Sequence, residues 1–143
     1  LQYGNQDISD WEGRLNTNND NRALTGFWIE SSLKISPIEQ AEVMERIFGE
    51  HSLYSQDTQD ALRQVMLAQT QEKTDMRIYG KTGMGKSDGV VVDAWYTGFA
   101  ERQEGHGYFC VYLGETGEGD VSSQRAKEIA FDILSAYQEG AES

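Results

Sequence analysis

Runs of apolar positions divide the chain into a sheet region and three helices. Residues 90–99, Val-Val-Val-Asp-Ala-Trp-Tyr-Thr-Gly-Phe, are rich in β-branched and aromatic side chains and predict a central strand. Residues 108–113 predict a further strand, and a third strand region begins at residues 76–79. Residues 104–107, Glu-Gly-His-Gly, predict a hairpin turn between the two longer strands. Three antiparallel strands are therefore expected.

A strong start signal predicts the first helix. Ser36 is a suitable N-cap, Pro37 suits the first helical position, and Glu39 completes a capping box. This helix is expected to run to about Phe48 and to stop at Gly49. A second helix is expected from near residue 55 to about residue 69, with a buried stripe of Ala61, Leu62, Val65 and Met66.

The last helix has the clearest periodicity. Its apolar residues recur at i, i+3, i+4, i+7, i+8 and i+11 and predict a buried stripe of Ala126, Ile129, Ala130, Ile133, Leu134 and Tyr137. The order helix, helix, three antiparallel strands, helix is typical of an α+β fold, in which helices pack on an antiparallel three-stranded sheet. With 143 residues the chain is expected to form a single domain, residues 1–143.

Charge and composition exclude several classes of function. The 24 acidic and 12 basic residues give a formal net charge of -12, which opposes binding to nucleic acid or to an anionic membrane surface. No apolar run approaches the roughly 20 residues of a membrane span. Cys110 is the only cysteine and His51 and His106 are the only histidines, so no internal disulfide, metal site or cofactor is expected. We interpret the histidines as surface residues and Cys110 as a small core residue.

One stretch, Tyr79-Gly80-Lys81-Thr82-Gly83-Met84-Gly85-Lys86-Ser87, has two incompatible interpretations. Its last eight residues fit the phosphate-loop pattern G-x-x-x-x-G-K-[ST], which requires a helix that begins at the Lys-Ser pair. Here Asp88-Gly89 and three valines follow, and they favour a turn and a strand. A nucleotide-binding loop and a hairpin turn without a ligand are therefore kept as alternatives. In the other register, Lys81-Thr82-Gly83 is the K-T-G triplet of penicillin-recognising serine enzymes.

The K-T-G triplet requires an edge strand that lines a cleft. Lysine supplies a positive charge, threonine a hydroxyl donor, and Gly83 would allow a ligand to approach the backbone. Four further motifs accompany the triplet: Tyr3-Gly4-Asn5, Phe27-Trp28-Ile29-Glu30, Leu33-Lys34-Ile35-Ser36-Pro37-Ile38-Glu39-Gln40 and Trp95-Tyr96-Thr97-Gly98-Phe99. Together these segments resemble the C-terminal half of class D β-lactamases and of the related β-lactam-sensing receptor domains. The resemblance implies a partial β-lactamase/transpeptidase-like fold whose intact domain binds β-lactam antibiotics.

The resemblance also implies roles for individual residues. Lys81 and Thr82 would hold the β-lactam carboxylate, and the backbone N–H of Met84 would be one donor of the oxyanion hole. Arg125 resembles the arginine at the start of the family's last helix that also pairs with the carboxylate; the alternative is an exposed charge. Trp28 resembles the tryptophan that packs near the family's active-site lysine; the alternative is an ordinary core aromatic.

The serine that the family acylates is not expected in this chain. It belongs to an S-x-x-K motif, with a second serine in an S-x-V motif, and both precede the Tyr-Gly-Asn segment. The one S-x-x-K match, Ser31-Ser32-Leu33-Lys34, lies before the Ser36 cap, so the helical turn that would join its serine and lysine is not expected. Glu115, Glu118 and Asp120 are interpreted as a solvated acidic loop. We therefore expect that the chain alone cannot form an acyl-enzyme.

The chain is accordingly expected to be the C-terminal part of a penicillin-binding domain, with the N-terminal half of the same domain as its partner. Apolar surface that this half would cover is expected to favour self-association or domain swapping. Residues 30–36 and the spacing from Gly83 to Trp95 resemble the sensor members, which implies the extracytoplasmic domain of a membrane-anchored, signal-transducing receptor. The alternatives are a secreted or periplasmic class D hydrolase and, more remotely, a nucleotide-binding module.

Overall fold

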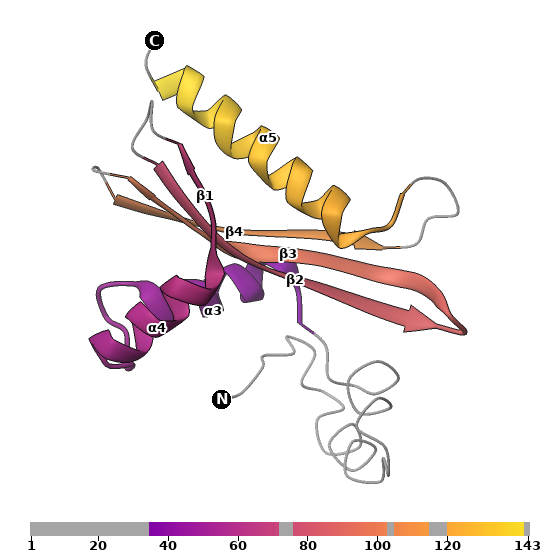
Figure 1. Ribbon diagram of the computed structural model, residues 1–143, viewed down its shortest axis with the longest axis horizontal. Helices are drawn as coiled ribbons and strands as arrows, with labels where there is room; N and C mark the ends of the chain where they lie inside the picture. Colours follow the sequence, from indigo (N-terminus) through magenta and orange to yellow (C-terminus); the bar gives the residue numbers. More distant parts are fainter. Residues whose placement is uncertain (1–34, 72–75, 103–104, 115–119, 142–143) are drawn as a thin grey trace, which may run out of the picture.

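Helices cover both faces of a central antiparallel sheet. The computed structural model describes residues 35–71, 76–102, 105–114 and 120–141. Within these ranges α5 (Ser123–Ala141) lies on one face of the sheet, and α3 (Pro37–Phe48) and α4 (Gln56–Met66) lie on the other (Figure 1). The predicted α+β fold class is confirmed.

Among the described residues the sheet has four strands, one more than the three predicted. Its strands follow one another in space as they do in the sequence, and each pairs antiparallel with the next: β1 (Leu67–Gln71), β2 (Met76–Ser87), β3 (Val90–Arg102) and β4 (Gly105–Gly114). The predicted central strand, β3, therefore has a neighbour on each side. The additional strand is β1, which pairs only with the first part of β2.

The start of α3 is built as its sequence predicts. The Ser36 hydroxyl accepts a hydrogen bond from the backbone N–H of Glu39 at 3.2 Å, and the Glu39 carboxylate accepts one from the backbone N–H of Ser36 at 2.8 Å. These two bonds form a capping box, and Pro37 occupies the first helical position. Gly49 is the C-cap, where the sequence predicts the end of the helix.

The second helix is shorter than predicted, and its buried face is different. α4 ends at Met66, and the chain then continues as β1, because pairing with β2 gives these residues sheet hydrogen bonds that outweigh a local helical preference. Met66 is buried and Leu62 packs against the core, as predicted. The prediction was wrong for Ala61, which is exposed, and for Val65, which is 78% exposed.

Two hairpins join the three long strands. Asp88 and Gly89 have positive φ angles of 50° and 82°, and Ser87 pairs with Val90, so a two-residue Asp-Gly turn links β2 to β3. At the other end, β3 residue 102 pairs with residue 105. Residues 105–107 therefore belong to β4, and the predicted turn over residues 104–107 was wrong in its position.

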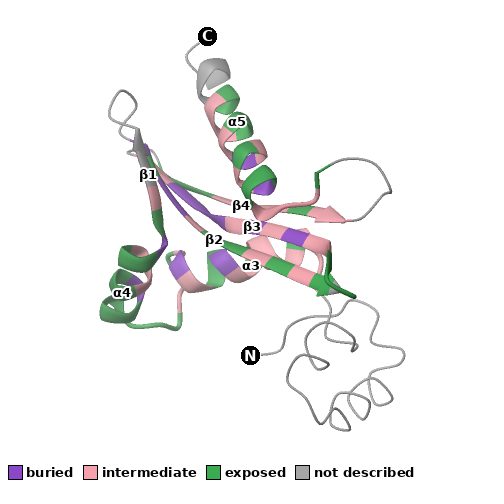
Figure 2. Ribbon diagram, turned by 45° about the vertical axis from the view of Figure 1, so that its right-hand side comes forward, coloured by how far each residue is buried: buried purple, intermediate pink, exposed green. Residues whose placement is uncertain are grey.

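The two faces of the sheet have separate cores. On the α5 face Met76, Ile78 and Ala100 form one cluster, and Tyr96 forms another with two alanines of α5. On the other face Phe99 stacks on Tyr79, with ring centroids 4.6 Å apart, beneath α3 and α4. Figure 2 shows buried residues in the first part of β2 and in β3, and exposed residues on α4.

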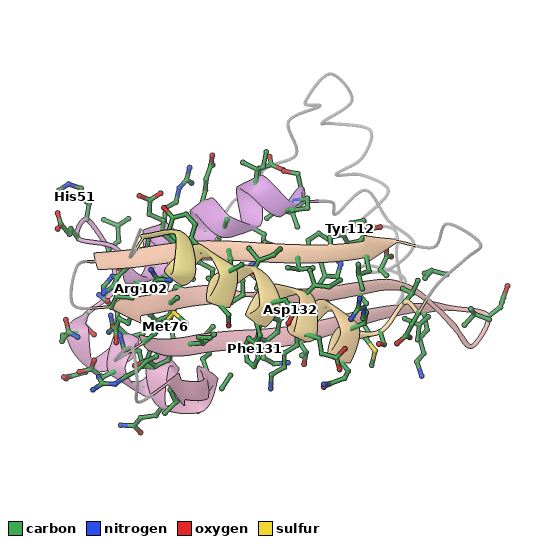
Figure 3. All side chains as sticks on the ribbon, turned by 90° about the horizontal axis from the view of Figure 1, so that it is seen from above. His51, Met76, Arg102, Tyr112, Phe131 and Asp132 are labelled. Carbon is green, nitrogen blue, oxygen red and sulfur yellow. The ribbon has the colours of Figure 1, made fainter. Side chains whose placement is uncertain are left out.

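The buried stripe of α5 is rotated from the predicted one. Ala126 and Ala130 are buried, and Leu134 packs against the sheet, as predicted. Phe131 also packs there. Ile133 and Tyr137 are 59% and 73% exposed, so the prediction that they are buried was wrong, although the Arg102 guanidinium of β3 lies 5.6 Å from the centroid of the Tyr137 ring. The alanines let the helix approach the sheet closely, and this orientation directs Phe131 inward. Figure 3 shows α5 crossing above the strands.

Candidate functional site

The K-T-G triplet lies on a stretch of strand that is paired on one side only among the described residues. β1 pairs with residues 76–79 of β2 and with none beyond them. Residues 80–87 of β2 pair only with β3, and the described residues supply no strand on their other side. Lys81, Thr82 and Gly83 are therefore at an open edge of the sheet that the described residues form, which is the strand position that the triplet requires.

Strand register places the Lys81 and Thr82 side chains on opposite faces of the sheet. Thr82 pairs with Tyr96, which is buried beneath α5, so the Thr82 side chain is on the α5 face. Lys81 pairs with Thr97, on the face that α3 and α4 partly cover. The Lys81 ammonium nonetheless donates a hydrogen bond to the backbone carbonyl of Thr82 at 2.7 Å. The Lys81 ammonium thus reaches the backbone of Thr82 at the edge of β2, although the Thr82 hydroxyl lies on the opposite face of the sheet.

The backbone groups of Met84 point to the same side of the strand as those of Thr82. In an antiparallel strand the N–H and C=O of one residue point to the same side, and residues two apart point alike. The Met84 N–H therefore points to the side of the strand to which the Thr82 carbonyl points. The intervening Gly83 is not required by packing, because a Cβ atom there would be 3.6 Å from the Cβ of Trp95, an ordinary contact. Met84 itself is 54% exposed.

Tyr96 is a residue of the site region that the sequence did not single out. It is 2% exposed, and its ring lies over the backbone of Gly80, directly before Lys81. Burial raises the pKa of Tyr96 to about 12, and its hydroxyl has no hydrogen-bond partner among the described residues. The Trp-Tyr-Thr-Gly segment identified a strand, but only the register shows that this tyrosine lies opposite Thr82.

Arg125 is in the first turn of α5, on the same face of the sheet as Thr82. Its backbone N–H donates to the Ser122 hydroxyl at 3.2 Å, and the next residue, Ala126, packs against Tyr96. The Arg125 guanidinium lies 3.4 Å from the carboxylate of Glu128, and each side chain is 49% exposed. Hydrogen bonds from Gln124 and then from Arg125 lower the pKa of Glu128.

Residues 1–135 match the model of the penicillin binding protein transpeptidase domain family. The chain belongs to this family. It is 35% identical over 139 residues to Beta-lactamase OXA-1 from Escherichia coli, and the match covers 94% of this chain and 47% of that protein. It is 28% identical over 134 residues to the Regulatory protein BlaR1 from Staphylococcus aureus, covering 94% of this chain and 20% of that protein.

Solved structures of class D β-lactamases have the same fold as this member of the transpeptidase domain family. A class D β-lactamase from Bacillus subtilis superposes with a TM-score of 0.65 at 26% identity, covering 94% of this chain and 54% of that chain. The chain thus spans about half the length of its class D relatives and about a fifth of the regulatory protein. The predicted resemblance to class D β-lactamases and β-lactam-sensing receptors is confirmed.

The fold of this transpeptidase-family chain contradicts the phosphate-loop alternative. Residues 80–87 are continuous strand, and the Asp88-Gly89 turn returns the chain directly as β3. A phosphate loop requires a helix N-terminus at this point, where backbone N–H groups and the helix dipole meet the phosphates. No such helix follows Ser87, so the nucleotide-binding interpretation was wrong.

The other candidate residues are dispersed or lie outside the described residues. Trp28, the Tyr3-Gly4-Asn5 motif and the Ser31-Ser32-Leu33-Lys34 match lie outside them, as do residues 115 and 118. His51 and His106 are at the surface, and His106 lies 3.5 Å from the Glu101 carboxylate rather than at the K-T-G edge. In the described ranges no three or more histidine, cysteine or acidic side chains are grouped to hold a metal, and no helix is long and apolar enough to cross a membrane.

Proposed function

We propose that this chain is the C-terminal part of a β-lactam-binding domain and that the open edge of β2 holds the carboxylate of the bound antibiotic. The observation that carries this proposal is that Lys81-Thr82-Gly83 lies on the stretch of β2 that pairs only with β3 among the described residues, with the Lys81 ammonium 2.7 Å from the carbonyl oxygen of Thr82. A cation and a hydroxyl donor then meet at one backbone edge, which suits a carboxylate.

The carboxylate would receive hydrogen bonds from both sides of the sheet. The Lys81 ammonium would approach the carboxylate from the face of the sheet that carries α3 and α4. The Thr82 hydroxyl would donate a hydrogen bond to it from the α5 face. Arg125, in the first turn of α5, is on the Thr82 side and supplies a second positive charge. Charge-assisted hydrogen bonds of this kind are about twice as strong as neutral ones.

The Met84 N–H would donate a hydrogen bond to the lactam carbonyl that reacts. A ligand that lies along the open edge brings its lactam carbonyl to the next backbone donor on the same side of the strand, two residues beyond Thr82. A donor placed there stabilises the negative charge that develops on the carbonyl oxygen when a nucleophile attacks. The serine nucleophile would come from the N-terminal half of the same domain. Its hydroxyl oxygen forms an ester with the carbonyl carbon, the lactam C–N bond breaks, and the nitrogen takes up a proton.

We further propose that the parent protein is a β-lactam sensor in a signal-transducing receptor, with this domain outside the cytoplasm. The support is the likeness to the Regulatory protein BlaR1 over 94% of the chain. The alternative is a secreted or periplasmic class D hydrolase, which the higher identity to Beta-lactamase OXA-1, 35% over 139 residues, favours. Both functions need the same carboxylate-binding edge and differ in how long the acyl-enzyme persists.

We also propose that the N-terminal half of the domain covers apolar side chains that are exposed in this chain. Ile133 and Tyr137, one turn apart on α5, are 59% and 73% exposed, and Leu53 is 98% exposed. Such residues favour self-association of the chain when it is isolated. Gel filtration of the isolated chain over a range of concentrations measures this association, and a monomer at every concentration would contradict it.

Acylation of the full-length protein tests the proposed function. After mixing with benzylpenicillin, mass spectrometry is expected to show one covalent adduct, and the adduct's lifetime separates the two activities. A sensor keeps the adduct long after free antibiotic is removed, whereas a hydrolase loses it rapidly and turns over nitrocefin. The isolated chain is the matched control and is expected to remain unlabelled. Absence of both an adduct and turnover in the full-length protein would overturn the proposal.

A further inference from the structure

Arg125 already has a carboxylate partner. Its Nη1 atom lies 3.4 Å from Oε2 of Glu128, three residues further along α5. The other carboxylate oxygen of Glu128 accepts a hydrogen bond from the Gln124 side-chain amide at 3.0 Å. Gln124 and Arg125 thus hold the Glu128 carboxylate on the helix surface, and the guanidinium is paired on the helix itself.

We propose that Glu128 competes with the antibiotic's carboxylate for Arg125 and so lowers the affinity of the site for the antibiotic. This inference rests on the proposed function, in which Arg125 binds the ligand's carboxylate. The two anions are the same chemical group, and both prefer the planar N–H fork of a guanidinium. A ligand can take Arg125 only when the Arg125–Glu128 contact weakens or is shared. Glu128 is a positioning residue in this account, because it acts through Arg125 and does not contact the ligand.

The exposure of the pair keeps this competition modest. Arg125 and Glu128 are each 49% exposed, and an ion pair between exposed residues at i and i+3 has a small net free energy that salt reduces. The ligand's carboxylate, in contrast, would also receive hydrogen bonds from Lys81 and Thr82. The ligand therefore displaces Glu128 from Arg125. Loss of the Arg125–Glu128 ion pair reduces the apparent affinity for the ligand but does not prevent its binding.

Other groups near Arg125 do not take this role. The Asp120 carboxylate accepts a hydrogen bond from the Ser122 hydroxyl at 3.1 Å, and the Lys127 ammonium lies 5.3 Å from the ring centroid of Phe131. Asp132, one turn beyond Glu128, is an exposed carboxylate and is labelled on α5 in Figure 3. It supplies a matched control, since its removal changes the charge of the helix by the same amount.

The experiment compares two ligands that differ only in the carboxylate. The second-order acylation constant of the full-length protein is measured with benzylpenicillin and with its methyl ester. Glu128→Gln is expected to raise the constant for the free acid about two- to five-fold, the range that exposed ion pairs give, and to leave the constant for the ester unchanged. Asp132→Asn is expected to change neither constant by more than about 1.5-fold.

Three results would overturn the inference. The first is a free-acid constant for Glu128→Gln that is unchanged or lower. The second is an equal gain for the free acid and the ester, and the third is an equal gain in Asp132→Asn. Arg125→Ala separates this failure from failure of the proposed function. If Arg125→Ala lowers the free-acid constant while Glu128→Gln has no effect, only the role of Glu128 is wrong. If Arg125→Ala leaves the preference for the free acid intact, Arg125 does not bind the carboxylate and both assignments are wrong.

Discussion

The ring of Tyr96 lies on the backbone of Gly80, so close that a Cβ atom at Gly80 would overlap the ring and its hydroxyl. On the α5 face of the sheet the Tyr96 side chain extends from β3 across to β2, and the cross-strand partner of Tyr96 is Thr82. The contact therefore supports β2 from the α5 face at the residue before Lys81. Because the other side of residues 80–87 has no strand among the described residues, this support helps to fix the position of the K-T-G edge.

Substitution at two glycines of β2 separates this contact from a general effect on the strand. Gly80→Ala is expected to lower the free energy of unfolding by about 1–3 kcal/mol, because the new methyl group must displace the Tyr96 ring. Gly83→Ala, where the methyl group makes an ordinary contact, is expected to leave it unchanged or to raise it by about 0.4–1 kcal/mol. Urea denaturation measures both. Equal destabilisation by the two variants would contradict the account.

The buried hydroxyl of Tyr96 gives a second prediction. The hydroxyl has no partner among the described residues, and an unsatisfied buried polar group is costly. Tyr96→Phe is therefore expected to raise the free energy of unfolding, by about 1 kcal/mol, while Tyr96→Ala lowers it by about 3–5 kcal/mol through loss of the ring. Thermal unfolding compares these variants. A clear loss of stability in Tyr96→Phe would show that the hydroxyl is hydrogen-bonded.

Local signals in the sequence predicted most of the fold. The capping box at Ser36 and Glu39 placed α3, and the Val-rich and aromatic segment placed β3. The end of α4 was missed, because β1 depends on pairing with β2, a contact between segments that local propensity does not report. On α5 the periodicity was correct, but Ile133 and Phe131 are both apolar, and only packing against the sheet decides which one is buried.

The candidate site was predictable in part. Lys81 and Thr82 follow from a three-residue motif, and the turn after them follows from Asp88-Gly89. Tyr96 could not be identified from the sequence, because its contact with Gly80 depends on strand register and on a side chain that crosses to the neighbouring strand. The pairing of Glu128 with Arg125 is a matter of helix-surface geometry that many charged i, i+3 pairs share.

A network at the opposite end of the sheet is expected to contribute more to stability than to binding. The Glu101 carboxylate accepts hydrogen bonds from Tyr79 at 3.0 Å and from Arg63 at 3.2 Å, and joins α4, β2 and β3. Glu101→Gln is expected to lower the free energy of unfolding by about 1–3 kcal/mol. Asp60→Asn removes only the exposed partner of Arg63, 3.3 Å away, and is expected to cost less than about 1 kcal/mol. Chemical denaturation of both variants measures the difference, and equal losses would contradict it.

The single thiol is expected to be unreactive while the chain is folded. Burial raises the pKa of Cys110 from 9.0 to about 11, and the thiolate is the reactive form. At pH 8 the folded chain should therefore react with a disulfide reagent about a hundred-fold more slowly than the unfolded chain. As the pH rises from about 9 to about 11, the Cys110 thiol ionises in the unfolded chain but stays protonated in the folded chain. This difference favours the unfolded chain, so the free energy of unfolding falls over this pH range. Reaction rates with and without urea test this, and equal rates would contradict it.

The most direct test of the central claim is the carboxylate preference of the full-length protein and its Lys81→Ala variant. The account predicts that Lys81→Ala lowers the second-order acylation constant for benzylpenicillin by about 10- to 100-fold, the range expected when a charge-assisted hydrogen bond is lost. The constant for the methyl ester should hardly change. An equal loss for acid and ester, or no loss for either, would show that the open edge of β2 does not hold the carboxylate.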